Sequence, residues 1–439
     1  MTQGSIFRHF MHFAIPMMIG LLFQQLYNTV DTLVVGQFVS TQALAAVGNT
    51  GNIINLFVGL CAGLSTGASV TISQAYGAHD YKRLHDAVHT TILVTLILCA
   101  IATVGALLLI DPLLRLMEMP SDVYGDAKTY LTIYFEGLTG LLIYNMGGGI
   151  LRAVGDSRRP LLFLVFSAIV NTALDLTFVL AFHMGVEGVA YATIMAQGLS
   201  ASLILWVLTR EQAPYAIHWN QLSIRKEVLR DILKIGLPSG FQQALTSFSN
   251  VFVQSYIHAF GAAGMAGYSI YNKLDQFVLI PVQGLALTTT TFVGQNYGAG
   301  NYKRTKEGTH KALLYSLLAT AVLATLLLFF HRSIISLFSD DPEVLDYGSR
   351  FLMIITPFYL TICFNQNYAG ALRGIGSAQL PMAVMIFSFV IFRQIYLYTS
   401  KLLGGGFLSV ALAYPLGWVL CSILLAICFY RSKLYQKQH

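Results

Sequence analysis

Long stretches of this sequence contain no Asp, Glu, Lys or Arg, and most are long enough to cross a lipid bilayer as a helix. A helix needs about 20 residues to span a hydrocarbon core ~30 Å thick. The stretches are continuously apolar rather than alternating, which favours helices over the strands of a barrel. They cover residues 32–79, 87–110, 160–174, 188–209, 235–272, 276–302, 312–331, 351–372, 374–392 and 402–430.

Composition excludes a soluble enzyme. Only 10% of the 439 residues are charged and 55% are hydrophobic, whereas an ordinary soluble domain has about 25% charged residues. The net charge of +6 comes from short basic clusters between apolar runs, a pattern that indicates membrane orientation rather than nucleic-acid binding. The five cysteines are odd in number and lie inside apolar runs, so we expect neither a disulfide framework nor a metal site.

Turn residues divide the apolar stretches into about twelve helices, which predicts an all-α integral membrane protein. Residues 32–79 are too many for one crossing, and Gly36 with the polar residues at 40–42 indicates a turn inside this stretch. The predicted helices cover roughly 10–38, 44–73, 86–110, 127–150, 160–182, 188–209, 231–258, 266–293, 310–331, 347–370, 381–402 and 407–430.

The basic residues favour one orientation in the membrane. Of the 26 Lys and Arg residues, 19 fall at the termini or in even-numbered loops and five in odd-numbered loops. Cytoplasmic loops carry such an excess. We therefore expect a multi-pass protein of the cell (inner or plasma) membrane, in contact with its lipids, with both termini in the cytoplasm.

An internal repeat divides the chain. QAYGAHDYKR at 74–83 returns as QNYGAGNYKR at 295–304, and LRAVGDSRRP at 151–160 returns as LRGIGSAQLP at 372–381. Both pairs are separated by the same offset in the sequence. We interpret these loops as helix-ending turns that repeat because the fold repeats.

Two parallel six-helix halves follow from this repeat. They cover 1–210 and 231–439 and are joined by a cytoplasmic linker at 211–230. Because six crossings return the chain to its starting side, both halves enter from the same face. Such repeats place substrate sites between the halves near mid-membrane.

Asp31 is an acid inside the first predicted helix, where an ionised group costs about 2.5–3.5 kcal/mol on insertion scales. Tyr27 and Asn28, four and three residues earlier, share its face and are candidates to bond its carboxyl. Pro16 favours a bend in the same helix, and we expect that bend to accompany a change of charge at Asp31. No basic residue lies in the helices of this half away from their ends to neutralise the acid, so we interpret Asp31 as functional.

Asp175 is a second such acid, in the fifth predicted helix, with Asn171 four residues earlier on the same face. Two isolated carboxylates with amides beside them suit a hard cation such as Na⁺, or a shared proton. We predict a coupling site for H⁺ or Na⁺ and no other cofactor.

The second half offers a less defined polar set. Asp275 and Lys273 are two residues apart and do not face each other on a helix, whereas Arg393 in another helix is a candidate partner for an acid. A structural ion pair and a coupling site both remain open for this group. Glu136, at a helix end, is expected near the headgroups.

The histidines and the large apolar residues of the predicted helices allow only general interpretations. We expect His89 and His310, beside helix starts, to be interface residues rather than proton carriers. Most Met, Phe and Tyr residues are expected to pack or face lipid. An adaptable apolar substrate cavity is a further hypothesis, lined by Phe23, Tyr27, Asn28, Tyr144 and Met146.

The whole chain resembles the multidrug and toxic compound extrusion family, MATE. The resemblance rests on YNTVDTLVVGQ, LAAVG, GQNYGAGNYKR and the paired LRxxG loops. It implies a V-shaped fold whose cleft opens alternately to each side, and an antiporter that expels amphiphilic, often cationic compounds in exchange for Na⁺ or H⁺.

The first half is similar to the DinF-like branch of that family. The resemblance implies a cation site at Asp31, Asn171, Asp175 and Thr193, and a helix bend at Pro16. The NorM-like branch has an acid in the seventh helix, and this chain has none between 235 and 272. A polar site in the second half would then use Gln242, Asn250, Lys273, Asp275 and Arg393.

We therefore predict a secondary active multidrug efflux antiporter, not an enzyme, that works as a monomer on small organic substrates. The first alternative is a flippase for a lipid-linked precursor on the same fold, which should line its cleft with several basic residues. A membrane-embedded prenyl transferase would need clustered acids for metal–diphosphate chemistry, and the only doublet is Asp340–Asp341 in a loop.

Overall fold

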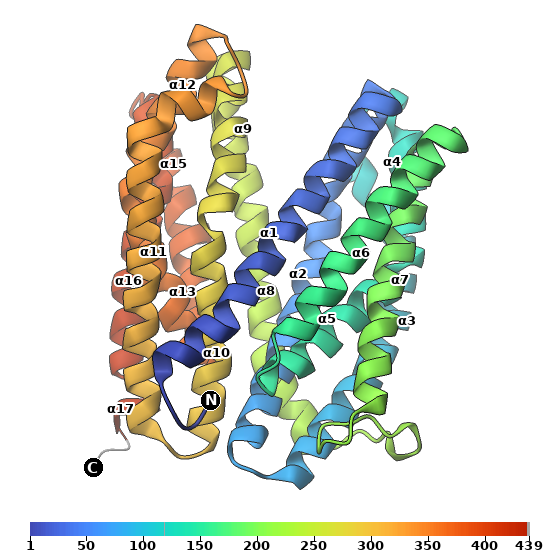
Figure 1. Cartoon of the computed structure of the whole chain (residues 1–439). Coiled ribbons are helices and arrows are strands. Elements are labelled where there is room, and N and C mark those ends of the chain that lie inside the picture. Colours follow the sequence, from blue (N-terminus) through green and yellow to red (C-terminus); the bar gives the residue numbers. More distant parts are fainter. Residues whose placement is uncertain (118, 437–439) are drawn as a thin grey trace. The chain divides into compact units, whose positions relative to one another are not determined.

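The computed structural model describes residues 1–117 and 119–436. These residues form helices joined by turns and loops, and none of them lies in a strand (Figure 1). Short 3-10 or π turns are labelled η. The elements are α1 (Ile6–Phe38), α2 (Thr41–Gly77), α3 (Tyr81–Leu116), α4 (Ser121–Glu136), α5 (Leu138–Ala153), α6 (Arg158–Leu176), η1 (Thr177–Ala181), α7 (Val186–Arg210), η2 (Trp219–Gln221), α8 (Lys226–Ile257), η3 (His258–Phe260), α9 (Gly261–Val278), α10 (Ile280–Gly298), α11 (Tyr302–Ser336), α12 (Pro342–Ile355), η4 (Thr356–Phe358), α13 (Tyr359–Gly374), α14 (Gln379–Ile386), η5 (Phe387–Phe392), α15 (Arg393–Leu402), α16 (Phe407–Tyr430) and α17 (Lys433–Gln436).

The predicted all-α membrane fold is confirmed. Within the described residues, ten helical runs are long and apolar enough to cross a membrane. One of them, at 226–298, is long enough for two crossings and is divided at η3. The fourth predicted span is present as α4 and α5, which meet at Gly137. These elements account for the twelve predicted spans.

The repeated loops are helix-to-helix turns, as the sequence predicted. Asp80 and Asn301, which occupy equivalent positions of the repeat, each accept a hydrogen bond from the backbone N–H three residues later, at 3.0 and 3.1 Å. Such side chains satisfy the free N–H groups at a helix start. The residues just before them, His79 and Gly300, both have positive φ, 54° and 71°. The repeat therefore preserves a turn followed by an N-cap.

The chain forms two compact units, Met1–Met18 with Phe241–His439, and Ile19–Gly240. These units differ from the boundaries expected at 210 and 231, because α1 and α8 each pass from one unit into the other. The start of α1 packs with the second-half helices, where the rings of Phe10 and Phe292 lie 5.0 Å apart. Segment 211–225 packs on α3 instead of forming a free linker, as the bond from Arg225 N–H to Thr90 Oγ1 at 3.1 Å shows.

In the Ile19–Gly240 unit, α2 meets the start of α8 through glycines. A Cβ on Gly63 would collide with the backbone of Gly240, and one on Gly67 would collide with the carbonyl of Ile232. Small residues allow helix backbones to approach closely in membrane proteins. This approach brings α8 into the unit formed by the first-half helices.

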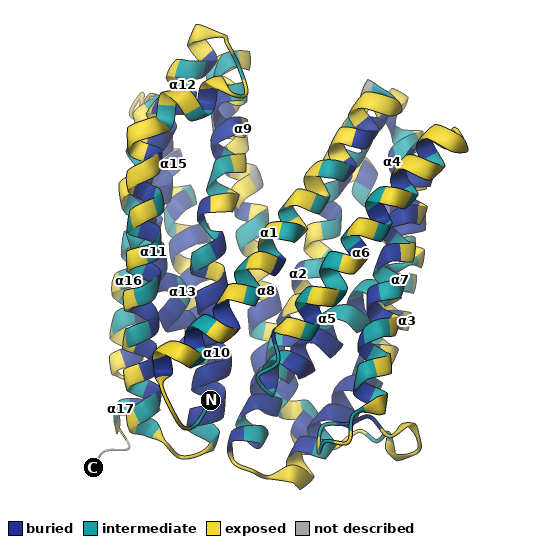
Figure 2. Ribbon diagram, in the orientation of Figure 1, coloured by how far each residue is buried: buried dark blue, intermediate teal, exposed yellow. Residues whose placement is uncertain are grey.

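Large apolar side chains remain exposed along the helices. Leu108 on α3 and Phe329 on α11 are 73% and 79% exposed, and Figure 2 colours long strips of α3 and α11 as exposed or half-buried. In water such strips would cause aggregation, whereas in a bilayer they face lipid. The exposed surface thus agrees with the membrane assignment made from composition.

Candidate functional site

The four residues of the predicted cation site come from three helices of the Ile19–Gly240 unit. Asp31 lies on α1, Asn171 and Asp175 lie on α6, and Thr193 lies on α7. All four are buried, with Asp31 8% exposed and Asp175 fully buried. Asn171 and Asp175 share a face of α6 because they are four residues apart. The structure therefore gathers the predicted set in one place.

The two carboxyl groups are neighbours. The side chain of Asp31 interacts directly with those of Asp175 and Tyr27, and Tyr27 also interacts with Thr193. The hydroxyl of Thr193 donates a 2.9 Å hydrogen bond to the carbonyl of Val189 in its own helix, so its oxygen faces Tyr27 as an acceptor. The arrangement concentrates oxygen atoms around Asp31 and Asp175.

No basic side chain neutralises these acids among the described residues. The ion pairs found there include neither Asp31 nor Asp175. One oxygen of Asp31, both oxygens of Asp175 and both amide atoms of Asn171 are buried, and apart from the contact between the two carboxyls none of them has a hydrogen-bond partner. Burying an ionised carboxylate without a counter-charge costs several kcal/mol (order of magnitude). A proton or a small cation would remove this cost, and carboxylate, amide and hydroxyl oxygens are the ligands that hard cations prefer.

Two tyrosines near the carboxyls were not predicted. Tyr130 and Tyr134, both on α4, are buried and interact electrostatically with Asp31. Their spacing of four residues places them on one face of α4, and this was the only signal in the sequence. They add apolar surface and hydroxyl groups to the surroundings of the acid.

Asn28 does not join the site, contrary to the prediction. Asn28 is exposed, whereas Tyr27 contacts Asp31. One residue turns a helix by about 100°, so neighbours on the sequence face different directions. Pro16 lies inside α1, and the helix continues past it from Ile6 to Phe38. Pro16 is two residues before Met18, where the Met1–Met18 segment ends.

Met146, one of the residues predicted to line a substrate cavity, packs inside a hydrophobic core. Met146 is 1% exposed and packs in a core that includes Ile72 and Ile204. The neighbouring Gly147 leaves no room for a Cβ beside Ile204. The hydroxyl of Tyr144 donates to the carbonyl of Pro160 at 3.0 Å. These two residues stabilise the packing of α5, while Phe23 is half-buried on α1.

The second-half polar residues separate into two groups. Nη2 of Arg393 donates to Ser249 Oγ at 2.7 Å and to Asn250 Oδ1 at 2.9 Å, and its guanidinium lies 5.1 Å from the ring centroid of Tyr414. Gln242 is buried on the same helix, α8, as Ser249. Arg393 thus holds α8 against α15.

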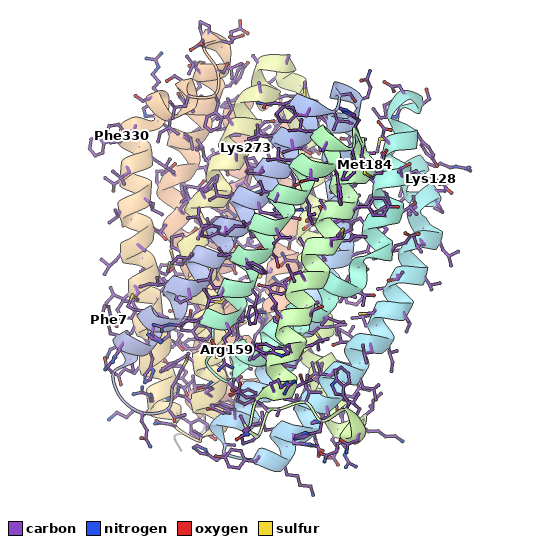
Figure 3. All side chains as sticks on the ribbon, turned by 45° about the vertical axis from the view of Figure 1, so that its right-hand side comes forward. Phe7, Lys128, Arg159, Met184, Lys273 and Phe330 are labelled. Atoms are coloured by element: carbon purple, nitrogen blue, oxygen red, sulfur yellow. The ribbon has the colours of Figure 1, made fainter. Side chains whose placement is uncertain are left out.

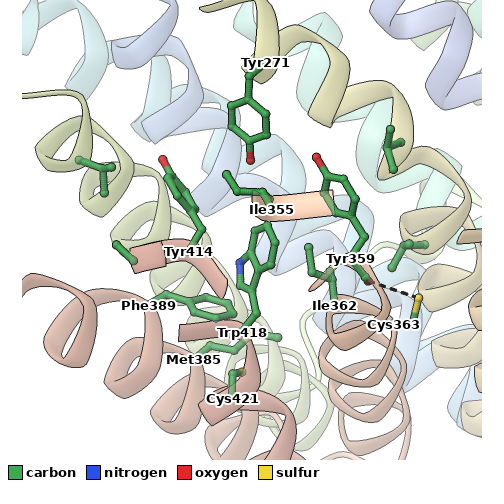
Figure 4. Close-up of a cluster of buried hydrophobic side chains, with 14 of the residues drawn as sticks. Tyr271, Ile355, Tyr359, Ile362, Cys363, Met385, Phe389, Tyr414, Trp418 and Cys421 are labelled. Atoms are coloured by element: carbon green, nitrogen blue, oxygen red, sulfur yellow. Dashed lines mark hydrogen bonds between the residues drawn. The ribbon is translucent and has the colours of Figure 1, made fainter. Parts of the chain in front are cut away.

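The acid of the second half bonds tyrosines instead. Asp275 accepts hydrogen bonds from Tyr359 at 2.7 Å and from Tyr271 at 3.3 Å. Figure 4 shows Tyr271 and Tyr359 among the buried side chains of the second half, whereas the hydroxyl of Tyr414 pairs with that of Tyr268 at 2.7 Å. Lys273, labelled in Figure 3, is exposed on α9. Within the described residues, Lys273, Asp275 and Arg393 form no ion pair with one another, so the structural ion pair considered from the sequence is not made.

A sequence model of the MatE family matches residues 16–177 and 238–399. The chain belongs to the MatE family. The two matched segments are equal in length and begin near Pro16 and Pro238, one in each half, which agrees with the internal duplication.

Curated relatives resemble this MatE chain over most of its length. It is 27% identical to "Probable multidrug resistance protein YpnP" of Bacillus subtilis (strain 168), over 89% of this chain and 88% of the relative. It is 23% identical to a "FAD transporter" of Shewanella oneidensis, over 99% of this chain and 96% of the relative.

Solved structures share the fold of this MatE chain. A multidrug resistance MATE family transporter of the MOP superfamily, in an outward-facing conformation, matches with a TM-score of 0.90 and 26% identity, covering 98% of this chain and 96% of that one. A MATE structure in the bent conformation matches with a TM-score of 0.92 and 25% identity, covering 99% and 97%. The twelve-helix MATE fold is therefore shared along the whole chain.

Proposed function

We propose that this MatE chain exports amphiphilic, cationic organic compounds from the cell in exchange for H⁺ or Na⁺. The observation that carries the proposal is the pair of adjacent buried carboxyls, Asp31 and Asp175, with no basic partner among the described residues. The names of curated relatives, such as "Multidrug export protein MepA" of Staphylococcus haemolyticus, support the cargo class. The chain works as a monomer among membrane lipids, with both termini in the cytoplasm.

Asp31, Asn171, Asp175 and Thr193 take up the coupling ion in this proposal. The ion neutralises Asp31 and Asp175 and draws α1, α6 and α7 together around it. Asp31 lies on α1, and the part of this helix up to Met18 belongs to the other compact unit. A change at Asp31 therefore acts on a helix shared by both units, and Pro16, which lacks an N–H to bond the preceding turn, makes that helix easier to bend.

The test uses purified protein in vesicles that carry an imposed pH or Na⁺ gradient, one at a time, with an ethidium-like dye as cargo. Asp31→Asn with Asp175→Asn should abolish gradient-driven dye transport. Asp122→Asn removes an exposed acid of α4 and should leave it unchanged. The gradient that drives transport identifies the coupling ion. Coupled transport by a folded double variant, measured beside Asp122→Asn, would reject the mechanism.

A flippase or anion exporter on the same fold is the second candidate, and Arg393 is the observation in its favour. Arg393 is 3% exposed, and its Nε is buried without a partner. A buried guanidinium that forms no ion pair with a carboxylate in the described part of the chain suits an anionic group of a cargo. Loss of transport of an anionic lipid or dinucleotide in Arg393→Met, with dye export retained, would favour this candidate.

A further inference from the structure

Three stacked histidines hold segment 211–225 on α3. The rings of His85 and His89 lie 3.8 Å apart, and that of His218 lies 6.2 and 6.1 Å from them. His85 and His89 belong to α3, whereas His218 belongs to the segment that leads into α8. His89 is fully buried. All three residues are part of the Ile19–Gly240 unit.

The bonds of His89 fix its protonation state. Nδ1 lies 2.8 Å from the carbonyl oxygen of His85, which can only accept, so Nδ1 carries the hydrogen. Nε2 accepts a 3.0 Å hydrogen bond from the backbone N–H of His218. The imidazole is therefore neutral while the segment is docked. A proton on Nε2 would place two N–H groups against each other.

Other groups surround this bond. His85 and His218 face the ring of His89 directly. Asp86 on α3 lies 3.4 Å from Nε of Arg225 in the segment, and Arg83 on α3 pairs with Asp231 on α8 at 2.7 Å. Asp86 also lies 4.0 Å from Nδ1 of His85. The burial of His89, together with the two stacked imidazoles, disfavours a positive charge on its ring.

We propose that His89 is a proton-sensitive latch that docks segment 211–225 on α3 at neutral pH and releases it on acidification. A free histidine takes up a proton below about pH 6.5. Docking then keeps its full strength above that pH and weakens as the pH falls below it, since only the released state accommodates the proton. The latch acts on the segment that continues into α8, the helix that passes from one compact unit into the other.

The duplicated half supplies a natural comparison. His310 occupies the position of the repeat that corresponds to His89, and its Nδ1 bonds the carbonyl of Lys306 at 2.8 Å in the same way. Its Nε2, however, lies 3.3 Å from the hydroxyl of Tyr430. A hydroxyl both donates and accepts, so it can turn to bond an imidazole nitrogen with or without a hydrogen. His310 therefore occupies the position of the latch without the backbone N–H that makes the bond of His89 one-sided.

Hydrogen–deuterium exchange on the full chain in lipid nanodiscs tests the proposal, with rates converted to protection factors to remove the intrinsic effect of pH. Protection of residues 213–225, above all the amide of His218, should fall by up to about tenfold between pH 7.5 and pH 5.5, the largest change that one proton taken up below pH 6.5 can produce. Protection around His310 should not change. A wild-type profile without this fall would overturn the proposal.

Variants assign the effect to His89. His89→Gln should remove the pH dependence, whereas His218→Gln should retain it because the bond uses the backbone N–H. His310→Gln should leave the segment unaffected. Thr90→Val removes the bonds of Thr90 Oγ1 with Arg225 N–H and the Ser223 carbonyl, and should lower protection at every pH. A pH-dependent fall that persists in a folded His89→Gln variant would reject His89 as the titrating group.

Discussion

His310 faces the hydroxyl of Tyr430 at 3.3 Å, whereas its counterpart in the first half, His89, accepts a hydrogen bond from the backbone N–H of His218 at 3.0 Å. The duplication has kept the residue and changed its partner. A hydroxyl tolerates either protonation state of an imidazole, and an N–H tolerates only one. Repeated residues in this chain therefore need not share a role.

Gly67 should resist substitution more strongly than Gly105. Gly67→Ala would force apart α2 and the start of α8, because its Cβ would collide with the Ile232 carbonyl. Overpacking of this kind costs about 1–3 kcal/mol of unfolding free energy. Gly105 on α3 has open space around it, so Gly105→Ala should be neutral or slightly stabilising. Thermal unfolding of both purified variants in detergent measures the difference, and equal midpoints would contradict the close approach.

Tyr359 should contribute more to stability than Tyr271, although both bond Asp275. The hydroxyl of Tyr359 lies 2.7 Å from Asp275 Oδ1 and that of Tyr271 lies 3.3 Å away. Tyr359→Phe would leave the carboxyl short of its stronger donor and should cost about 1–3 kcal/mol. Tyr271→Phe should cost less. Thermal unfolding of the two variants checks the order, and the reverse order would show that the shorter bond is not the stronger one.

The periodic features of the fold could be predicted from sequence, and the partners of individual side chains could not. Charge-free runs placed the helices, and the spacing of four residues placed Asn171 and Asp175 on one face. The same reasoning placed Tyr27 and Asn28 together, yet only Tyr27 contacts Asp31. Successive residues of a helix point about 100° apart, so the residues three and four positions before Asp31 both lie on its side of the helix. Spacing alone therefore cannot decide which of them contacts the carboxyl.

Contacts distant in sequence account for the other differences. The packing of segment 211–225 depends on Thr90 and His89, residues that no local pattern links to a segment so much later in the chain. Arg393 likewise bonds Ser249 and Asn250 instead of an acid. The sequence showed that Arg393 was available as a partner, but only the packing of α15 against α8 decides which groups it reaches.

Thr193 should affect coupling through its hydroxyl. Its hydrogen donates to the Val189 carbonyl at 2.9 Å, so its oxygen can act towards a cation only as an acceptor, beside its contact with Tyr27. If Na⁺ drives transport, Thr193→Val should raise the Na⁺ concentration for half-maximal transport about tenfold, equivalent to about 1.4 kcal/mol. Thr193→Ser retains the hydroxyl and should restore the wild-type value. Equal Na⁺ dependence in the valine and serine variants would exclude Thr193 as a ligand.

Asp175→Asn should stabilise the protein at pH 9. Asparagine has nearly the same shape and carries no charge, so it removes an acid whose two oxygens are buried beside the carboxyl of Asp31 and receive no hydrogen bond from a basic group. Relief of a buried uncompensated charge should raise the unfolding free energy by about 1–3 kcal/mol. The gain should shrink at pH 5, where a protonated Asp175 is itself neutral. The unfolding free energy of the wild type should therefore be lower at pH 9 than at pH 5, because the buried acid must carry its charge at the higher pH.

Asp111→Asn is the matched control for Asp175→Asn. It removes an acid that has partners, so it should not stabilise the protein at pH 9. Asp111 is half-exposed and accepts bonds from Lys128 at 2.9 Å and Tyr124 at 2.7 Å. Losing this solvent-exposed pair should lower the thermal unfolding midpoint slightly or not at all, because water and salt screen exposed charges. Thermal unfolding at pH 5 and pH 9, without added Na⁺, compares the two variants. If Asp175→Asn is destabilising at pH 9, then Asp175 is held by a partner in the folded protein, and the coupling site proposed around it loses its physical basis.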